Sequence, residues 1–463
     1  MKKNMGLRIA RIHAGLLAWL VPAAMALAGK PISFPDAATR IEDHPQLEVR
    51  EALHQGAQAM RDGARALRYP NIGVAATYAR ISDPIELDLG LLNLILHDLD
   101  PRLPKIPNPV LQPDTFGIAM ATITWPIFTG GRISAANEAS KAGIIVTEAA
   151  RDETRDALLL DLVARYHGVG VAMQALAVEE GVVASLREHL RHANSLEANG
   201  QIAALDRMRV EVALAQAETS RQQRLHALEI AKAGLASLLS LEDDVDPVTQ
   251  LGTPPRVEAL SSYQSEALQT NPVLRQIAAA AEQAEQGVRA AHGEYWPTVA
   301  LVGGYELESY HLPELVPEWT VGVTVAMPLF DGGARRSRLS MAKSKLLEAQ
   351  ALHRDGRNKI RLIIQQRYLD CEDAIRRVDV ATRTVALARE SLRMQRIAFA
   401  EGETRSIDVV DAENALATAR LGRLAARYDH ALAWATLMLA SGHRDEVVRV
   451  FSQDYSEADS NAY

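Results

Sequence analysis

The sequence is built from two copies of one unit, and this internal repeat limits most strongly the folds open to the chain. The corresponding pairs are Tyr69 with Trp296, Pro70 with Pro297, Pro126 with Pro328, Phe128 with Phe330, Gly130 with Gly332, Gly200 with Gly402 and Asp206 with Asp408. The first two pairs are 227 positions apart and the others 202, so the first copy carries 25 extra residues between Arg80 and Thr115. A register this constant indicates a duplication, and each copy is one structural repeat.

Each copy is predicted to fold as a helix, two strands, a long helix and a shorter return helix. The long helix of the first copy lacks proline and has apolar residues at helical spacing, such as Leu158, Leu162 and Tyr166. Gly200 and Gly402 then mark the helix–helix turns, as left-handed caps do. The predicted long helices are 132–198 and 203–241 in the first copy and 334–400 and 404–441 in the second. Helices of this length must pack laterally, in the manner of a coiled coil.

Both ends of the chain have distinctive compositions. Lys2 and Lys3 precede an apolar run that closes with Ala26, Leu27 and Ala28, which predicts a signal peptide over 1–28 that is cleaved near Ala28. The alternative, an uncleaved anchor, is disfavoured because the run is shorter than a spanning helix needs. The remaining boundaries are a first repeat at 29–255, a second repeat at 256–443 and an acidic tail at 444–463, which is expected to be poorly ordered.

Four segments alternate with a period of two, which is typical of strands. They are predicted at about 71–81, 115–126, 298–308 and 319–329. Each has about 10 residues, the length of a tilted strand that crosses a bilayer, although the phase of the second strand is ambiguous. The aromatic residues expected to form an interfacial girdle at the strand ends are Trp125, Trp296, Trp319 and Tyr69. The alternative is a soluble pair of hairpins whose tryptophans pack on the helices.

Composition narrows the function. The net charge of -8 argues against a nucleic-acid partner, and 5% aromatic residues favour helix over an all-β fold. A single cysteine, Cys371, excludes an intramolecular disulfide and is expected to be a packing residue. No catalytic or nucleotide-binding motif is found, so an enzyme, a cofactor and a metal are not expected. His189 and His192 are spaced to share a metal, but a solvated helix face explains them better.

Four strands cannot close a membrane barrel, because the smallest barrels use about 8 and an open edge in lipid leaves backbone groups unpaired. The chain must therefore oligomerise if its strands enter a membrane. Totals of 8, 12 or 16 strands satisfy this condition, and the larger ones leave a water-filled lumen.

These features resemble the TolC family of outer-membrane efflux and secretion channels. The motifs that carry the resemblance are Trp-Pro-Ile-Phe-Thr-Gly-Gly-Arg from Trp125, Met-Pro-Leu-Phe-Asp-Gly-Gly-Ala from Met327, and Gly402 followed by Ile407, Asp408 and Val409. The resemblance covers nearly all of the chain after the signal peptide. It implies a mainly α fold with a small β part, in which two tandem repeats of long helices form a trimeric α-barrel and four strands per chain enter a 12-stranded barrel.

The same resemblance implies a passive duct in the outer membrane that continues as a helical tunnel through the periplasm. A homotrimer would work with a periplasmic adaptor and an inner-membrane pump, for efflux or type I secretion. The alternative from a different class is a soluble periplasmic coiled-coil adaptor or scaffold with a small β domain. The transported substrate does not follow from the sequence.

The turn after the second long helix carries a pair of carboxylates. Asp408 and Asp411 are three residues apart, so both project from one helix face. In a trimer they would form two stacked rings that favour cations in a narrow pore. The competing explanation is that acidic residues in a first helical turn, capped by Ser406 or Thr404, complement the helix dipole.

The resemblance also implies a latch at this end, between an aspartate that matches Asp206 and an arginine near Arg405. Arg405 is displaced by one position from the usual spacing, and Phe399 stands where a latch tyrosine is often found. Arg207 and Arg209 offer substitute cations.

The extra residues of the first copy lie within 82–114, which are rich in leucine and proline. This segment joins two strands at the end away from the helices and is expected to be an extracellular loop. Its leucines are expected to pack against each other; packing as a lid against neighbouring subunits is the alternative.

Overall fold

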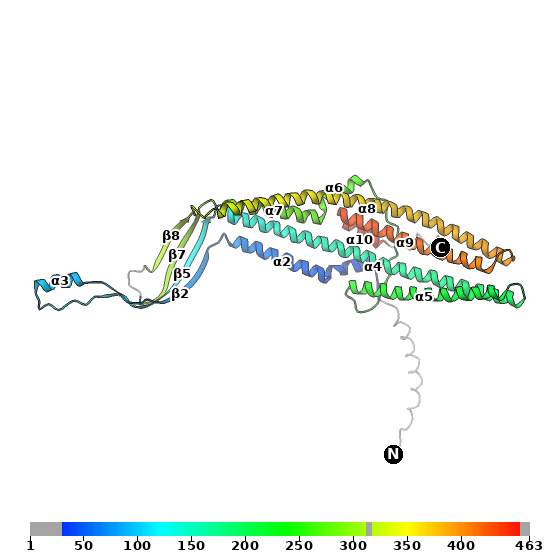
Figure 1. Ribbon diagram of the computed structural model, residues 1–463, viewed down its shortest axis with the longest axis horizontal. Coiled ribbons are helices and arrows are strands. Elements are labelled where there is room, and N and C mark those ends of the chain that lie inside the picture. Colours follow the sequence, from blue (N-terminus) through cyan, green and yellow to red (C-terminus); the bar gives the residue numbers. More distant parts are fainter. Residues whose placement is uncertain (1–29, 312–316, 454–463) are drawn as a thin grey trace, which may run out of the picture. The chain divides into compact units, whose positions relative to one another are not determined.

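The computed structural model describes residues 30–311 and 317–453. The predicted signal peptide, 1–28, and the last ten residues of the tail lie outside the described residues. Figure 1 labels the helices and strands, and the chain divides into two compact units. Unit 1 comprises Met1–Glu51, Ala150–Leu274 and Arg357–Tyr463, and unit 2 comprises Ala52–Ala149 and Arg275–Gly356.

Two helices of 67 residues form the framework of the described chain, and each has a shorter return helix. The four are α4 (Arg132–Ala198), α5 (Ala204–Leu238), α8 (Ala334–Ala400) and α9 (Ser406–Ser441). The return helix α5 stops at Leu238 instead of 241, because Ser240 adopts a positive φ of 53°. Helix α9 starts at Ser406 instead of 404, because Arg405 is an extended N-cap residue.

Prolines divide the helices that precede the strands. In the first repeat, α1 (Phe34–Arg40) and a 3-10 turn (Ile41–Asp43) end before Pro45, which opens α2 (Pro45–Ala66). In the second repeat, α6 (Leu260–Thr270) ends before Pro272, which opens α7 (Pro272–Gly293). Proline lacks an amide donor but fits the first position of a new helix, so each proline ends one helix and starts the next.

Unit 2 contains an antiparallel four-stranded sheet in the order β2-β5-β7-β8. The strands are β2 (Asn71–Arg80), β5 (Thr115–Phe128), β7 (Thr298–Tyr310) and β8 (Trp319–Ala326). The last strand ends at Ala326 instead of about 329, since Pro328 cannot donate to the ladder. Strand β5 continues past Pro126 through an irregularity between Pro126 and Phe128.

A buried aromatic cluster lies in unit 1. Phe34 of α1 contacts Tyr166 and His167 of α4, with ring centroids 5.3 and 5.6 Å apart. Trp434 of α9 and Phe451 complete the cluster. The short parallel strands β1 (Lys30–Ile32) and β6 (Val245–Pro247) are tied to it, because the Tyr166 hydroxyl donates to the Ile32 carbonyl (2.8 Å).

The start of the tail is ordered, contrary to the sequence prediction. Residues Arg444–Ser452 form helix α10, which buries Val447, Val450 and Phe451 against the aromatic cluster. Arg444 donates to the Asp156 carboxylate at 2.6 Å and fixes the start of this helix to α4. The apolar residues recur at intervals of three and four, so one helix face can be buried although the tail as a whole, 444–463, is acidic.

His167 should make unit 1 sensitive to acid. Burial lowers the pKa of His167 to about 3, and its Nε2 has no hydrogen-bond partner among the described residues. Because the folded-state pKa lies below the unfolded value of about 6.5, the stabilising contribution is complete above that pH and is lost as the pH falls toward 3. Between pH 7 and 5 the loss should be about 2 kcal/mol.

The test is thermal unfolding at these two pH values. His167→Phe removes the titration and should reduce the fall in Tm between pH 7 and 5, while His226→Phe, at an exposed position of α5, should leave it unchanged. An identical pH dependence in both variants would contradict the assignment.

The segment between β2 and β5 carries its own elements. Strands β3 (Ile85–Glu86) and β4 (Val110–Gln112) pair, and helix α3 (Gly90–Leu99) lies between them in the chain. The leucines of this segment do not pack against each other as expected from the sequence, since Leu91 is 77% exposed and Leu94 is 69% exposed.

Candidate functional site: a one-sided apolar sheet and two helical turns

The register of the sheet places the apolar positions of all four strands on one face. Residues directly opposite in antiparallel strands share a face. The rows across the sheet are Ile72–Ile123–Gly303–Val321, Val74–Ala121–Tyr305–Trp319 and, across three strands, Trp125–Leu301–Val323. This register also fixes the phase of β5, which its sequence leaves ambiguous. The side chains of Ile72, Val74, Val321 and Val323 are exposed, so none of the described residues covers this face.

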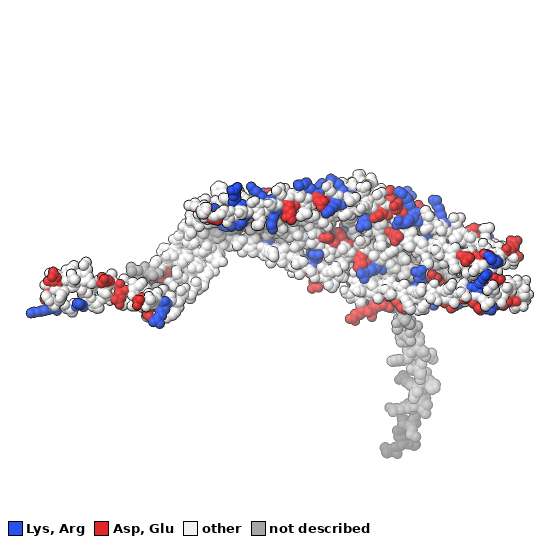
Figure 2. Space-filling model, in the orientation of Figure 1, with Lys and Arg blue, Asp and Glu red and all other residues white. Residues whose placement is uncertain are grey.

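Aromatic residues lie at both ends of this apolar face. Tyr69, Trp125 and Trp296 are at the end where the sheet meets the helices, and the Trp125 Nε1 donates to the Arg68 carbonyl (2.9 Å). Trp319 lies at the opposite end and faces Tyr305 across the ladder. In the space-filling view the sheet carries almost no charged groups (Figure 2). A charge-free apolar band between aromatic borders matches the lipid-facing surface of membrane strands.

One described helix, α4, includes a stretch that is long and apolar enough to cross a membrane by composition alone. Core helices satisfy the same criterion, and Leu162, Tyr166 and Val169 of α4 are fully buried in unit 1.

The two helical turns of unit 1 have the same construction. Gly200 has a φ of 71° and Gly402 a φ of 79°. The amides that follow them close the turns, because Gln201 N donates to Leu196 O (2.9 Å) and Glu403 N donates to Ala398 O (2.8 Å). A side chain at either glycine would be strained in this left-handed conformation, which explains the glycines.

Asp408 binds the start of α9. Its Oδ2 accepts from the Thr404 hydroxyl (2.8 Å) and from the Arg405 amide (3.0 Å), and the Arg405 guanidinium lies 3.6 Å away. The hydrogen bond from Thr404 makes the largest contribution to lowering the pKa of Asp408, and the hydrogen bond from the Arg405 amide makes the next largest. Asp411 is exposed one turn later. Asp408 therefore caps the start of α9, and Asp411 is an exposed carboxylate on the next turn.

The candidate latch residues pair locally within the chain. Asp206 pairs with Arg209 (3.5 Å), and Arg207 binds Glu197 at the end of α4 (2.7 Å) and Glu211 on α5. The ion-pair partner of Arg405 is Asp408, as described above. Within one chain, Asp206 and Arg405 are therefore not joined as an ion pair, and Arg207 and Arg209 have other partners.

A histidine joins α4 to the start of α9. His189 is only 8% exposed, so it does not lie on a solvated face as the sequence suggested. Its Nε2 is hydrogen-bonded to the Ser406 hydroxyl (2.8 Å), and its ring contacts Phe399 edge-on. Burial lowers the pKa of His189, against the opposing effect of the Ser406 hydrogen bond. The sequence does carry a signal for this burial: His189 is spaced three and four residues from Leu186 and Ala193, which lie on the buried face of α4.

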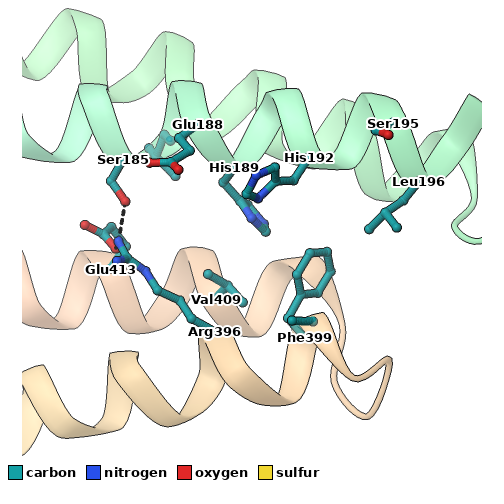
Figure 3. A pocket seen from close by; sticks show the side chains of 12 residues that line it. Ser185, Glu188, His189, His192, Ser195, Leu196, Arg396, Phe399, Val409 and Glu413 are labelled. Atoms are coloured by element: carbon teal, nitrogen blue, oxygen red, sulfur yellow. Dashed lines mark hydrogen bonds and ion pairs between the residues drawn. The ribbon is translucent and has the colours of Figure 1, made fainter.

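An arginine makes a second connection between the same elements (Figure 3). Nη2 of Arg396, on α8, donates to the Ser185 hydroxyl of α4 (2.6 Å) and to Glu413 of α9 (2.9 Å). The Glu413 side chain is only 9% exposed, so Arg396 is the counter-ion of a largely buried carboxylate. A buried charge that loses its partner is costly, which makes this contact a strong constraint on the turn.

These connections border a pocket of about 440 Å³ between α4 and the α8–α9 turn. Its walls combine Leu186, Leu196 and Phe399 with the polar His189 and Arg396. Among the described residues, no group of three or more His, Cys, Asp or Glu side chains is placed to hold a metal ion. Cys371 is buried in the core, and burial raises its pKa to about 11, which suits a packing role.

The chain belongs to the outer membrane efflux protein family, whose model matches residues 39–240 and 264–443. Outer membrane protein OprJ of Pseudomonas aeruginosa is 22% identical over 367 residues, which are 78% of this chain and 73% of OprJ. Protein CyaE of Bordetella pertussis is 27% identical over 271 residues, and the match spans little more than half of each protein, 56%. Alkaline protease secretion protein AprF of P. aeruginosa is 21% identical over 71% of this chain and 70% of AprF.

Solved structures show the same fold. CusC superposes with a TM-score of 0.73 at 15% identity, over 88% of this chain and 92% of CusC. The open-state channel MtrE of Neisseria gonorrhoeae gives a TM-score of 0.72 at 16% identity, over 89% of this chain and 90% of MtrE. The resemblance to the TolC family is confirmed, and the family supports an outer-membrane channel over a soluble periplasmic adaptor or scaffold.

Proposed function

We propose that three copies of this chain form a 12-stranded barrel in the outer membrane and a helical tunnel in the periplasm. The observation that carries the proposal is the four-stranded sheet with one apolar face, two aromatic borders and two open edges, β2 and β8. In lipid, every backbone amide and carbonyl must be paired, so β8 of one chain must pair with β2 of the next. Three chains close a barrel wide enough for a water-filled lumen.

The duct supplies neither energy nor catalysis. Substrates would be delivered by an inner-membrane pump through a periplasmic adaptor, after cleavage of the signal peptide near Ala28. The relatives include proteins named for efflux and for protease secretion, so both substrate classes are compatible with the fold.

Fractionation and electrophoresis test this function. The full chain should sediment with the outer membrane and migrate as a trimer that heating dissociates. Release by osmotic shock, or migration as a monomer without heating, would contradict the proposal.

The two helical turns are the proposed periplasmic entrance. The turn after α8 would present Asp408 and Asp411 of each subunit to the pore. The contacts Ser185–Arg396 and His189–Ser406 would hold the α8–α9 hairpin against α4 in place of an Asp206–Arg405 latch. These two contacts are described within one chain, and opening that moves the hairpin must break both.

Neutralising the entrance carboxylates should reduce cation selectivity. In Asp408→Asn with Asp411→Asn, an amide oxygen still accepts from the Arg405 amide, so the helix start is kept while two charges per subunit are lost. Planar-bilayer recordings should show cation preference falling toward none and block by multivalent cations disappearing, because charge rings act strongly in a narrow pore.

Asp243→Asn, an exposed change in the loop after α5, is the matched control and should leave selectivity unchanged. Unchanged selectivity in the double variant would show that both aspartates serve only the helix dipole.

A further inference from the structure

The helix α3 within the loop between β2 and β5 has its polar side turned toward the chain and its apolar side outward. Asn93 faces the returning arm of the loop, where its amide donates to the Ile106 carbonyl (2.8 Å) and its oxygen accepts from the Ile106 amide (2.8 Å). A second contact, from the Leu89 amide to the Asn108 side chain (3.0 Å), fixes the start of the helix. The orientation of α3 is therefore set by hydrogen bonds, and a rotation that hides its leucines would break them.

The outward side of α3 has the spacing of a helix–helix contact. Leu91, Leu94 and Ile95 follow at intervals of three and four and project from one side, and all three are exposed. Asp98 lies one turn later and is the one acidic residue inside the helix, so the uninterrupted apolar surface covers the first two turns. A soluble loop would not carry such a surface without a partner to cover it.

The charges around α3 distinguish between two surfaces that could cover its apolar side, a lipid membrane and a protein. Helices that lie on a membrane surface are rich in Lys and Arg, which are attracted to anionic headgroups. Residues 82–105 contain five acidic side chains and two basic ones, and the acidic ones flank the helix at Glu86, Asp88 and Asp100. Figure 2 shows acidic and basic groups around the uncharged surface of the loop. This charge pattern argues against an anionic lipid surface and leaves an apolar protein surface as the cover.

We propose that the cover of α3 is the same helix of the other two subunits, so that three α3 helices meet on the channel axis and plug the outer mouth of the barrel. The inference rests on the trimeric channel proposed above, in which three copies of the loop surround one axis. Only the first repeat has this insertion, so the trimer contributes three such helices. An apolar constriction excludes water and ions until it is displaced.

Cross-linking tests the contact. Leu94→Cys in the full-length protein, treated in outer membranes with a short bismaleimide, should give a cross-linked dimer on denaturing gels. The native Cys371 is only 1% exposed, so the unmodified chain should give no cross-link and serves as the background measurement. Met60→Cys on α2, which is 75% exposed, is the matched control, because residues on a barrel wall lie a third of the circumference from their copies.

The outcomes separate this inference from the proposed function. A heat-sensitive trimer in which residue 94 cross-links, and residue 60 does not, supports the plug. An intact trimer without cross-linking at residue 94, or quenching of a fluorophore at residue 94 by lipid-borne quenchers, overturns the plug and leaves the channel standing. Absence of the trimer itself contradicts the proposed function.

Conductance provides a second measurement. Replacing Leu91, Leu94 and Ile95 together with glutamine hydrates the contact, and single-channel conductance should rise by about two-fold or more. Val110→Gln, at an exposed site of β4 on the same loop, should leave conductance unchanged. Equal conductance of the triple variant and the unmodified chain would show that α3 does not obstruct the mouth.

Discussion

Val323→Arg and Leu301→Arg should each reduce membrane assembly by about 2 to 4 kcal/mol, because in the proposed barrel each places a charge in lipid near the middle of a spanning strand. The two residues are neighbours in the register of β7 and β8 and lie on the apolar face. The measurement is the yield of heat-sensitive trimer in the outer-membrane fraction, compared with the total chain produced.

Thr324→Arg is the matched control, since it lies next to Val323 on the same strand but on the opposite face. In the proposed barrel, a charge on that side projects into the water-filled lumen and should be tolerated much better. Similar losses from residues 323 and 324 would disprove the assignment of the two faces.

Arg396→Met should open the periplasmic entrance. The substitution removes the counter-ion of the largely buried Glu413 and the hydrogen bond to Ser185, at a cost of about 3 kcal/mol to the arrangement described. In planar bilayers the channel should then conduct several-fold better than the unmodified chain, because the α8–α9 hairpin is no longer held against α4.

Arg396→Lys keeps a positive charge near Glu413 but loses the forked donor geometry, so its conductance should be intermediate. Arg393→Met removes an exposed ion pair with Glu390 within α8 and should have little effect. If residues 393 and 396 gave the same small change, the Arg396 contacts would be incidental to gating.

The sequence predicts the helical framework well because its signals are local. A proline-free segment with apolar residues at helical spacing, followed by a glycine such as Gly200 or Gly402, indicates where a helix starts, which of its faces is buried and where it ends. The observed long helix α4 spans Arg132–Ala198. Helix α9, whose N-cap residue is Arg405, is one of the two return helices. The prolines at 45 and 272 were equally local signals, and they explain why the preceding helices are divided.

Contacts between distant segments were harder to predict. Phe451 is buried only because Phe34, more than 400 residues away in sequence, and Trp434 provide a surface for α10. The acidic composition of the tail concealed this amphipathic face. The spacing of His189 from Leu186 and Ala193 indicates a buried face, but its partner Ser406 lies more than 200 residues away in the sequence, so the hydrogen bond between them is known only from the fold.

The phase of β5 shows the same limit for strands. Residues such as Ile118 and Ile123 make both of its faces apolar, so alternation alone does not say which side is outward. Pairing with β2 and β7 does, because Ile123 stands opposite Ile72 and Gly303. Neighbouring strands therefore supply information that the strand itself lacks.

The open edges of the sheet have a genetic consequence. In the proposed trimer, β8 of each subunit needs β2 of the next, so a single subunit with an impaired edge would leave the whole barrel unclosed. In a cell that makes such a chain and the intact chain in equal amounts, only about one trimer in eight would consist of intact subunits. Mutations at these two strands should therefore be dominant, whereas a change confined to the surface of a tunnel helix should be recessive.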